Sequence, residues 1–409
     1  MLPLPADELQ LCSEQLWPQF DRQGYRVIAS ANTPAGWIEV ERHRAFGRRN
    51  RIDMILPVDR LPAARALSAY PGLRPFRRRM GRLALAAGLV TGLVGPVRSL
   101  ALISADSDTG TRTVMQQLRE ALSKDISAAM HVRRAANRKA LLQVVDDRGN
   151  TLGFAKLARN DVSLTGIRNE IDALTELDGG SGTVRTPRVL LSGESGGFPF
   201  VFSEPLPSSI RGCTTSIADT PTIAEFADLA PVRRWGSAGH TGHVKRLRAR
   251  LRVLPGASGP SALITALGEL LAMIDREEER MPIAKWSHGD FAFWNTGRAR
   301  DGTLWCWDFE NVEIDALAGL DVLHWHASRR RVSRGPDGVG DRVGILSDSA
   351  DLLAAFGVGS AASRALLYRT YIADIGMRTL ETACADGWQN VWARPDELEH
   401  LVRRAWAAD

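Results

Sequence analysis

The sequence predicts an α+β protein in which an antiparallel sheet with one helix precedes a mostly helical half. Between residues 126 and 204 the apolar pattern gives strand, strand, helix, strand, strand in that order. The strands follow from alternating or short apolar runs bounded by turn residues, and the helix from apolar residues at helical spacing. Beyond residue 206 helical stripes dominate, apart from a hairpin predicted near residues 293–309. The chain therefore divides into an N-terminal domain of α/β type at residues 1–125, a sheet lobe at 126–205 and a helical lobe at 206–409.

Composition limits the classes of function. The chain has 409 residues with 44% hydrophobic and 24% charged residues, which is ordinary for a globular protein. Its net charge is +5, but residues 1–100 hold 15 arginines against 8 acidic residues, so the remainder is slightly acidic. A nucleic-acid-binding domain would carry basic residues throughout, so we expect no nucleic-acid partner. The four cysteines form no CxxC pair, which argues against a disulfide framework or a zinc site and favours a cytoplasmic location.

One apolar run, residues 83–97 (LALAAGLVTGLVGPV), follows a cluster of arginines between residues 74 and 82. It is shorter than the roughly 20 residues that a membrane-spanning helix needs. We expect a buried helix here. An element that lies on a membrane surface through residues 74–97 is the alternative.

The predicted sheet lobe contains one lysine in a strand, Lys156 (FAKLA). A lysine in a half-buried strand is unusual unless it is paired. Glu170 lies fourteen residues later on the predicted helix, for which Ser163 is the expected N-cap. Two further strands follow, at residues 188–192 and 198–203. The sequence thus predicts a Lys156–Glu170 ion pair between strand and helix, and an ordinary pair at the surface is the alternative.

The most specific motif is the segment 286–296, WSHGDFAFWNT, which contains His288, Asp290 and Asn295 in the pattern H-x-D-x-x-x-x-N. A phosphotransfer loop needs a carboxylate beside the acceptor hydroxyl and an amide oxygen on Mg²⁺ shortly afterwards. Thirteen residues beyond Asn295, the segment WDFE brings Asp308 and Glu310. Carboxylate and amide oxygens are the ligands that Mg²⁺ prefers.

The combination of HGD-x₄-N with a hydrophobic-Asp-aromatic-Glu strand resembles the aminoglycoside phosphotransferase and choline kinase-like family, which has the two-lobed protein-kinase-like fold. Gly289 stands where eukaryotic protein kinases usually carry arginine, and Glu310 where they carry the glycine of D-F-G. Asp321 (GLDVLHW) matches the family's aspartate that braces the catalytic loop.

The resemblance implies ATP and Mg²⁺ as cofactors, with ATP between the two lobes. Asp290 would be the catalytic residue, Asn295 and Asp308 would hold the metal, and His288, Glu310 and Asp321 would support them. Lys156 and Glu170 would hold the α- and β-phosphates. The segment SEPL (Ser203, Glu204, Leu206) matches the hinge that pairs with adenine.

One departure from the family pattern concerns the phosphate loop. The segment expected there, residues 133–139 (RRAANRK), has no glycine. Asn137, Arg138 and Lys139 could contact phosphate, and a solvated hairpin tip is the alternative. The sequence leaves open which residues replace the Gly-rich loop.

The function expected from these motifs is transfer of phosphate from ATP to a hydroxyl group of a small molecule, such as a sugar, an aminoglycoside-like compound or another metabolite. Residues 206–285 carry 11 basic and 8 acidic residues, so no acidic pocket for a cationic sugar is evident. Two alternatives remain: a catalytically weak module that binds nucleotide or a partner, and a membrane-associated kinase for an envelope sugar. The oligomeric state is not indicated.

Overall fold

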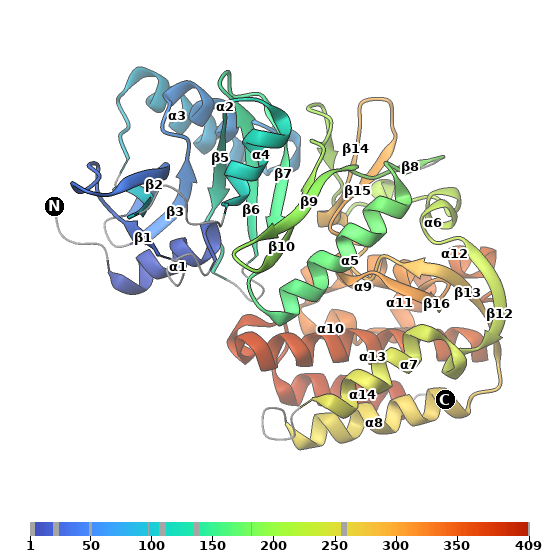
Figure 1. Cartoon of the computed structure of the whole chain (residues 1–409). Coiled ribbons are helices and arrows are strands. Elements are labelled where there is room, and N and C mark those ends of the chain that lie inside the picture. The colour runs from blue at the N-terminus through green and yellow to red at the C-terminus, as the bar shows by residue number, and fades with distance from the viewer. Residues whose placement is uncertain are drawn as a thin grey trace. The chain divides into compact units, whose positions relative to one another are not determined.

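A computed structural model describes residues 5–18, 24–48, 51–96, 98–105, 112–134, 139–180, 182–254 and 260–407. The chain forms two compact units, one of residues 1–178 and 187–211, the other of residues 179–186 and 212–409. They are called unit 1 and unit 2 below (Figure 1). The α+β class predicted from the sequence is confirmed, because unit 1 is built on an antiparallel sheet and unit 2 is mainly helical.

Unit 1 contains one nine-stranded sheet in the order β1-β4-β2-β3-β5-β6-β7-β10-β9, and every neighbouring pair is antiparallel. The strands are β1 (Tyr25–Ile28), β2 (Ile38–Arg48), β3 (Arg51–Leu56), β4 (Arg98–Ser104), β5 (Ile126–His131), β6 (Ala140–Asp146), β7 (Thr151–Leu157), β9 (Val189–Ser195) and β10 (Phe198–Ser203). Its helices are α1 (Ala6–Leu16), α2 (Arg60–Ser68), η2 (Pro71–Leu73), α3 (Phe76–Thr91), α4 (Val114–Leu122) and α5 (Asp161–Leu177).

The predicted boundary at residue 125 does not separate two compact units. Strand β3 pairs with β5, with Met54 opposite His131 and Ile55 opposite Met130, so the sheet continues across that boundary. Both sides also share a core, in which Ile55 and Met130 pack together with side chains from α1 and α4. The first 125 residues are therefore an extension of the sheet, and their strands are antiparallel.

The two faces of the sheet carry different helices. Met130 belongs to the core on the side of α1 and α4, while its neighbour Ala129 packs with α2 and α3, because successive side chains of a strand point to opposite faces. Helix α5 packs through Ile167 on Val201 of β10. Figure 1 shows α2 near β5, the middle strand of the sheet.

The expectation of a buried helix at residues 83–97 is wrong. Helix α3 buries only Ala86 and Leu89, against α2 and the sheet, and ends at the left-handed Gly92. The opposite side of α3 exposes apolar side chains, with Phe76 73% and Val90 54% exposed. No helix in the described ranges is long and apolar enough to span a membrane.

Helix α5 begins with a capping box, in which the Asn160 side chain accepts from the Ser163 backbone N–H and the Ser163 hydroxyl accepts from the Asn160 N–H. The predicted cap, Ser163, is thus the third helical residue, and Asn160 is the N-cap. Either residue satisfies a free donor of the first turn, and together they fix where the helix starts.

Unit 2 places its functional loop among two small sheets and a set of helices. One sheet is β12-β13-β16, and the other contains the hairpin β14–β15 with β8 parallel to β15. The elements are β8 (Val184–Arg185), β11 (Arg211–Gly212, where the chain enters the unit), η3 (Ile217–Asp219), α6 (Ile223–Leu229), β12 (Val232–Ser237), η4 (Ala238–His240), α7 (Gly242–Val253), α8 (Ser261–Arg276), β13 (Arg280–Ser287), η5 (Phe293–Asn295), β14 (Thr296–Arg298), β15 (Leu304–Cys306), η6 (Phe309–Asn311), β16 (Glu313–Leu317), α9 (Leu320–Arg334), α10 (Pro336–Val339), α11 (Arg342–Asp348), α12 (Ala350–Ala355), α13 (Ala361–Asp386), η7 (Trp388–Asn390) and α14 (Pro395–Ala407).

Candidate active site

The segment with the H-x-D-x-x-x-x-N motif is a loop between β13 and β14, called the catalytic loop below. Its turn is made at Gly289, which has φ +79°. A Cβ atom there would lie 2.0 Å from the carbonyl oxygen of Asn311, so the position requires glycine. The hairpin predicted near residues 293–309 begins later than expected, at β14, because Phe293–Asn295 is a 3₁₀ turn. That turn brings Asn295 back beside Asp290.

Asp321 holds the start of this loop from the first turn of α9. Its carboxylate accepts three hydrogen bonds, from the Ser287 hydroxyl at 2.9 Å, the His288 N–H at 2.9 Å and the Gly289 N–H at 3.0 Å. Asp321 is buried, so these bonds lie in a medium where unpaired donors are costly. The geometry suits the bracing role that the resemblance implies for this residue.

Asp290 is surrounded by donors. Its carboxylate accepts from Asn295 Nδ2 at 2.8 Å and lies 2.9 Å from His324 Nε2, and Trp294 Nε1 is 3.5 Å away. Burial acts to raise the pKa of Asp290, but the hydrogen bond and charge of His324 and the charge of Arg378 outweigh it, so this pKa lies below its ordinary value. The carboxylate is therefore deprotonated at neutral pH.

The contacts of Asp290 settle the orientation of the Asn295 amide. The amide nitrogen donates both to the Asp290 carboxylate and to the Asp290 carbonyl oxygen. Since the nitrogen faces Asp290, the amide oxygen faces the other way. This oxygen is the atom that a metal-binding role requires.

The β14–β15 hairpin is preceded in the chain by His288 and followed by Asp308 and Glu310. His288 Nδ1 lies 3.3 Å from the Asp290 backbone nitrogen, while its Nε2 lies 3.2 Å from the Trp307 carbonyl oxygen. Its ring also packs on Phe309, at 4.4 Å between centroids. Asp308 follows β15 in the left-handed conformation, with φ 74°, and Glu310 lies in the η6 turn after it. His288 thus connects the catalytic loop to the segment that carries Asp308.

Sequence reasoning missed a second histidine, His324, which touches Asp290 directly. It lies one helical turn after Asp321 on α9, and its Nδ1 is 3.3 Å from the Tyr371 hydroxyl on α13. Burial raises the pKa of Tyr371, so this hydroxyl stays protonated at neutral pH. The i, i+3 spacing from Asp321 was the available signal, because residues at that spacing share a helix face.

A pocket of about 270 Å³ opens beside Asp290, wholly within unit 2. Asp290, Trp294 and His324 form the wall nearest the catalytic loop, and Arg331 of α9 and Tyr371 of α13 also line it. Among the described lining residues, Asp290 is the one carboxylate. The pocket is a candidate binding site for a small molecule, because it is concave and ends at a deprotonated carboxylate.

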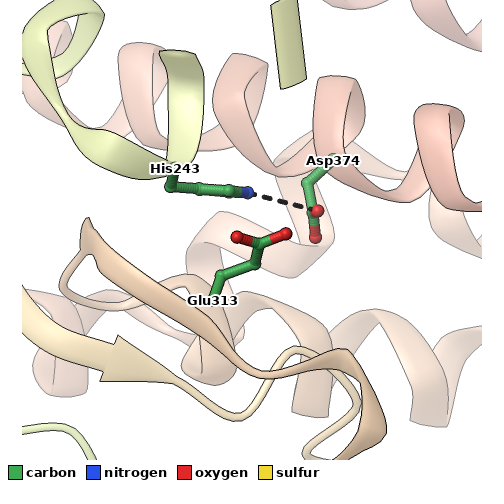
Figure 2. A group of neighbouring side chains, drawn as sticks. All are labelled: His243, Glu313 and Asp374. Carbon is green, nitrogen blue, oxygen red and sulfur yellow. Dashed lines mark hydrogen bonds and ion pairs between the residues drawn. The ribbon is translucent and has the colours of Figure 1, made fainter. Parts of the chain in front are cut away.

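Figure 2 shows a second cluster in unit 2, His243, Glu313 and Asp374, whose ligand atoms lie within 4.8 Å of one another. His243 Nε2 is 3.2 Å from the Asp374 carboxylate. Both carboxylates already have cationic partners: Arg250 and Arg246 lie 2.9 Å and 2.8 Å from Glu313, and Arg378 lies 2.7 Å from Asp374. The cluster is therefore a balanced network of charges, and nothing in it calls for a metal ion.

This charge network reaches the catalytic loop through Arg378. While one nitrogen of the guanidinium pairs with Asp374, another donates to the Gly289 carbonyl oxygen at 2.5 Å. Burial acts to lower the pKa of Arg378, but the charges of Asp374 and Asp290 raise it above its ordinary value. The guanidinium stays charged and holds the backbone next to Asp290.

In unit 1, Lys156 of β7 and Glu170 of α5 form the predicted ion pair. Lys156 Nζ lies 2.7 Å and 2.8 Å from the two carboxylate oxygens of Glu170. Glu170 is buried, and 16% of the lysine side chain is exposed. The pair fixes the ammonium group at the surface of the sheet, on the face that α5 covers.

The predicted hinge follows β10 in unit 1. Ser203 is the last residue of that strand and pairs with Phe154, and the Glu204 N–H donates to the Arg188 carbonyl oxygen. Pro205 has no N–H. Within the described part of the chain, the Leu206 N–H has no backbone partner, so it suits an adenine contact.

In the phosphate-loop segment, residues 135–138 lie outside the described residues, and Lys139 is buried.

Strand order β5-β6-β7-β10-β9 with α5 between β7 and β9, together with the loop after β13, defines the class of the chain as the protein-kinase-like fold. No family model and no curated protein matches the sequence. One similar solved structure is a protein assigned as a fructosamine-3-kinase of Haemophilus somnus 129PT, with 12% identity, 71% of this chain and 96% of that chain covered, and a TM-score of 0.44. A second is the gentamicin complex of APH(2″)-IIa, with 10% identity, coverages of 74% and 97%, and a TM-score of 0.41. A third is an ethanolamine kinase of Plasmodium vivax, with 9% identity, coverages of 72% and 86%, and a TM-score of 0.39.

The three TM-scores lie below 0.5, so the class of this chain rests on its own strand order and catalytic loop.

Proposed function

We propose that this protein is an ATP- and Mg²⁺-dependent phosphotransferase that phosphorylates a hydroxyl group of a small molecule. The observation that carries the proposal is the position of Asp290: its deprotonated carboxylate lies at the wall of a pocket and is bonded to Asn295 of the same loop. A kinase catalytic loop needs this arrangement, because the residue that orients the acceptor and a residue that binds the metal must keep a fixed position relative to each other.

The donor atoms suit Mg²⁺. Asp308 offers carboxylate oxygens and Asn295 an amide oxygen that faces away from Asp290, and hard oxygen ligands of this kind are what Mg²⁺ binds. When bound, the metal would neutralise charge on the phosphates of ATP. Lys156, held by Glu170, would contact the α- and β-phosphates, and the Leu206 N–H would pair with adenine.

In the transfer step, the acceptor oxygen forms a bond to the γ-phosphorus while the bond from that phosphorus to the bridging oxygen of ADP breaks. The hydroxyl proton passes to Asp290. His324 and Arg378 lower the pKa of Asp290, so the carboxylate serves mainly to orient the hydroxyl and takes the proton late. Most of the rate enhancement would then come from positioning and charge stabilisation.

The test is a screen of metabolites with ATP and Mg²⁺ that reads ADP release, followed by Asp290→Asn. This substitution keeps the size and hydrogen-bonding shape but removes the charge. We expect kcat to fall by ~10²–10⁴-fold, the usual value of a positioned general base, with ATP affinity almost unchanged. Transfer within a few-fold of the parent would rule out Asp290 as the base.

Asp308→Ala is the complementary variant. It should abolish the Mg²⁺-dependent part of ATP binding while the fold stays intact, because Asp308 is a half-buried residue at the end of a short strand. The measurement is the rise in melting temperature with ATP, with and without Mg²⁺. An equal Mg²⁺-dependent rise in variant and parent would show that Asp308 does not bind the metal, and a parent with no such rise would favour a module that does not use Mg-ATP.

A further inference from the structure

The pocket beside Asp290 contains a cation that has no partner of opposite charge among the described residues. Arg331 of α9 lines it, half-buried, and its guanidinium lies over two indole rings, 5.0 Å from the Trp294 centroid and 5.9 Å from that of Trp392. Among the residues that the structure describes, none accepts a hydrogen bond from the Arg331 side chain or pairs with it. The guanidinium therefore has two aromatic neighbours, and its N–H groups have no acceptor among the described residues.

The other arginines of α9 show that this is a particular feature of Arg331. Arg330 pairs with Asp341 and Asp348, Arg334 pairs with Asp341, and Arg329 donates to the Thr215 carbonyl oxygen. Three of the four arginines on the helix thus have acceptors in the protein. The fourth is the one that lines the pocket, where a bound molecule could supply the missing acceptor.

The charges in the pocket wall favour a negative ligand. Asp290 is the one carboxylate among the described residues of this wall, and it already faces His324. A cationic acceptor would meet Arg331 without a second carboxylate to offset the repulsion. A planar guanidinium beside aromatic rings can present two parallel N–H groups, the geometry that binds a carboxylate or phosphate in a bidentate manner.

We propose that the acceptor carries an oxyanion, a carboxylate or a phosphate, in addition to the hydroxyl that is phosphorylated, and that Arg331 binds this oxyanion. The inference rests on the proposed function for the identity of the acceptor, but the anion site itself does not depend on catalysis. A site for an oxyanion at Arg331 excludes polycationic aminoglycosides as preferred substrates.

The experiment has an activity arm and a binding arm, both on the full-length chain. In the activity arm, the screen compares matched acceptors: D-glucose as neutral, D-glucuronate as carboxylate, D-glucose 1-phosphate as phosphate and kanamycin as cation, within a wider library sorted by charge. We expect the highest kcat/KM among anionic acceptors, and the carboxylate and phosphate members distinguish the two sources of the oxyanion. A neutral or cationic best acceptor would overturn the proposal.

Arg331→Ala should then raise KM for the anionic acceptor by about 10- to 100-fold, the usual effect of a charge-assisted hydrogen bond, and leave kcat within a few-fold. Arg331→Lys keeps the charge but loses the planar pair of donors, so its KM should lie between those of the parent and of Arg331→Ala. Arg334→Ala is the matched control: it removes an arginine of the same helix whose partner Asp341 is also held by Arg330. Equal KM values for Arg331→Ala and Arg334→Ala would overturn the proposal.

The binding arm uses inorganic phosphate and glucuronate, measured by calorimetry without ATP, with melting temperatures to verify folding. Binding that Arg331→Ala and Arg331→Lys both weaken, in a protein that phosphorylates nothing, would keep the anion site and contradict the proposed function. Turnover of neutral acceptors with no anion binding would support the proposed function and overturn the anion site.

Discussion

The catalytic loop of unit 2 and the sheet of unit 1 differ in how far along the chain their stabilising contacts reach. The loop is held mostly from nearby: Asp321 accepts hydrogen bonds from residues 32 to 34 positions earlier, and His324 contacts Asp290 across 34 positions. In the sheet, Tyr25 pairs with Ser104 and Met54 with His131, across much longer stretches that contain other elements. A short motif can therefore encode the loop, whereas no local pattern encodes the order of the strands.

The largest effect that this difference predicts is on folding. A chain that starts at residue 126 would lose β1–β4 together with α1 and α4, and it would expose the edge of β5 and the core around Met130. We expect it to be insoluble or to melt without cooperativity, because a bare strand edge beside an open core pairs with other chains. Size-exclusion chromatography and thermal melting of this fragment and of the full chain give the comparison.

A soluble monomeric fragment that melts cooperatively and binds ATP would instead show that residues 126–409 fold alone. The extension would then be a separable addition to the sheet.

A smaller effect is expected at Asp321. Asp321→Ala leaves the backbone N–H groups of His288 and Gly289 buried without an acceptor, which should reduce the free energy of unfolding by about 2–4 kcal/mol. It should also lower kcat, because the same bonds fix the backbone next to Asp290. Denaturant unfolding and initial rates are the measurements, with Asp348→Asn, a partly exposed carboxylate paired with Arg330, as the control. Losses no larger than those of the control would show that the loop is held mainly by Arg378 and His324.

Much of the site could be predicted from the sequence, because most of its predicted residues lie within one segment of 34 positions, from His288 to Asp321. Asp321 was found in this way, and the Lys156–Glu170 pair was found because strand and helix are consecutive. Arg378 and Tyr371 could not be found, since α13 meets the loop only in the folded chain. The single sheet was missed for the same reason: the pairing of β3 with β5 leaves no mark in either strand.

The smallest effect tests the surface of α3, where hydropathy alone predicted burial. Helix α3 turns Leu89 towards the sheet, 1% exposed, and Phe76 away from it, 73% exposed. Phe76→Glu should change the free energy of unfolding by no more than about 0.5 kcal/mol, since an acidic residue in the first turn of a helix is favourable. Leu89→Ala, on the same helix, should cost about 2–5 kcal/mol because it opens a cavity. Denaturant unfolding of both variants measures the two changes in the free energy of unfolding. If Phe76→Glu destabilised the protein as much as Leu89→Ala, the apolar side of α3 would be covered in solution, and composition would have predicted its environment better than the structure does.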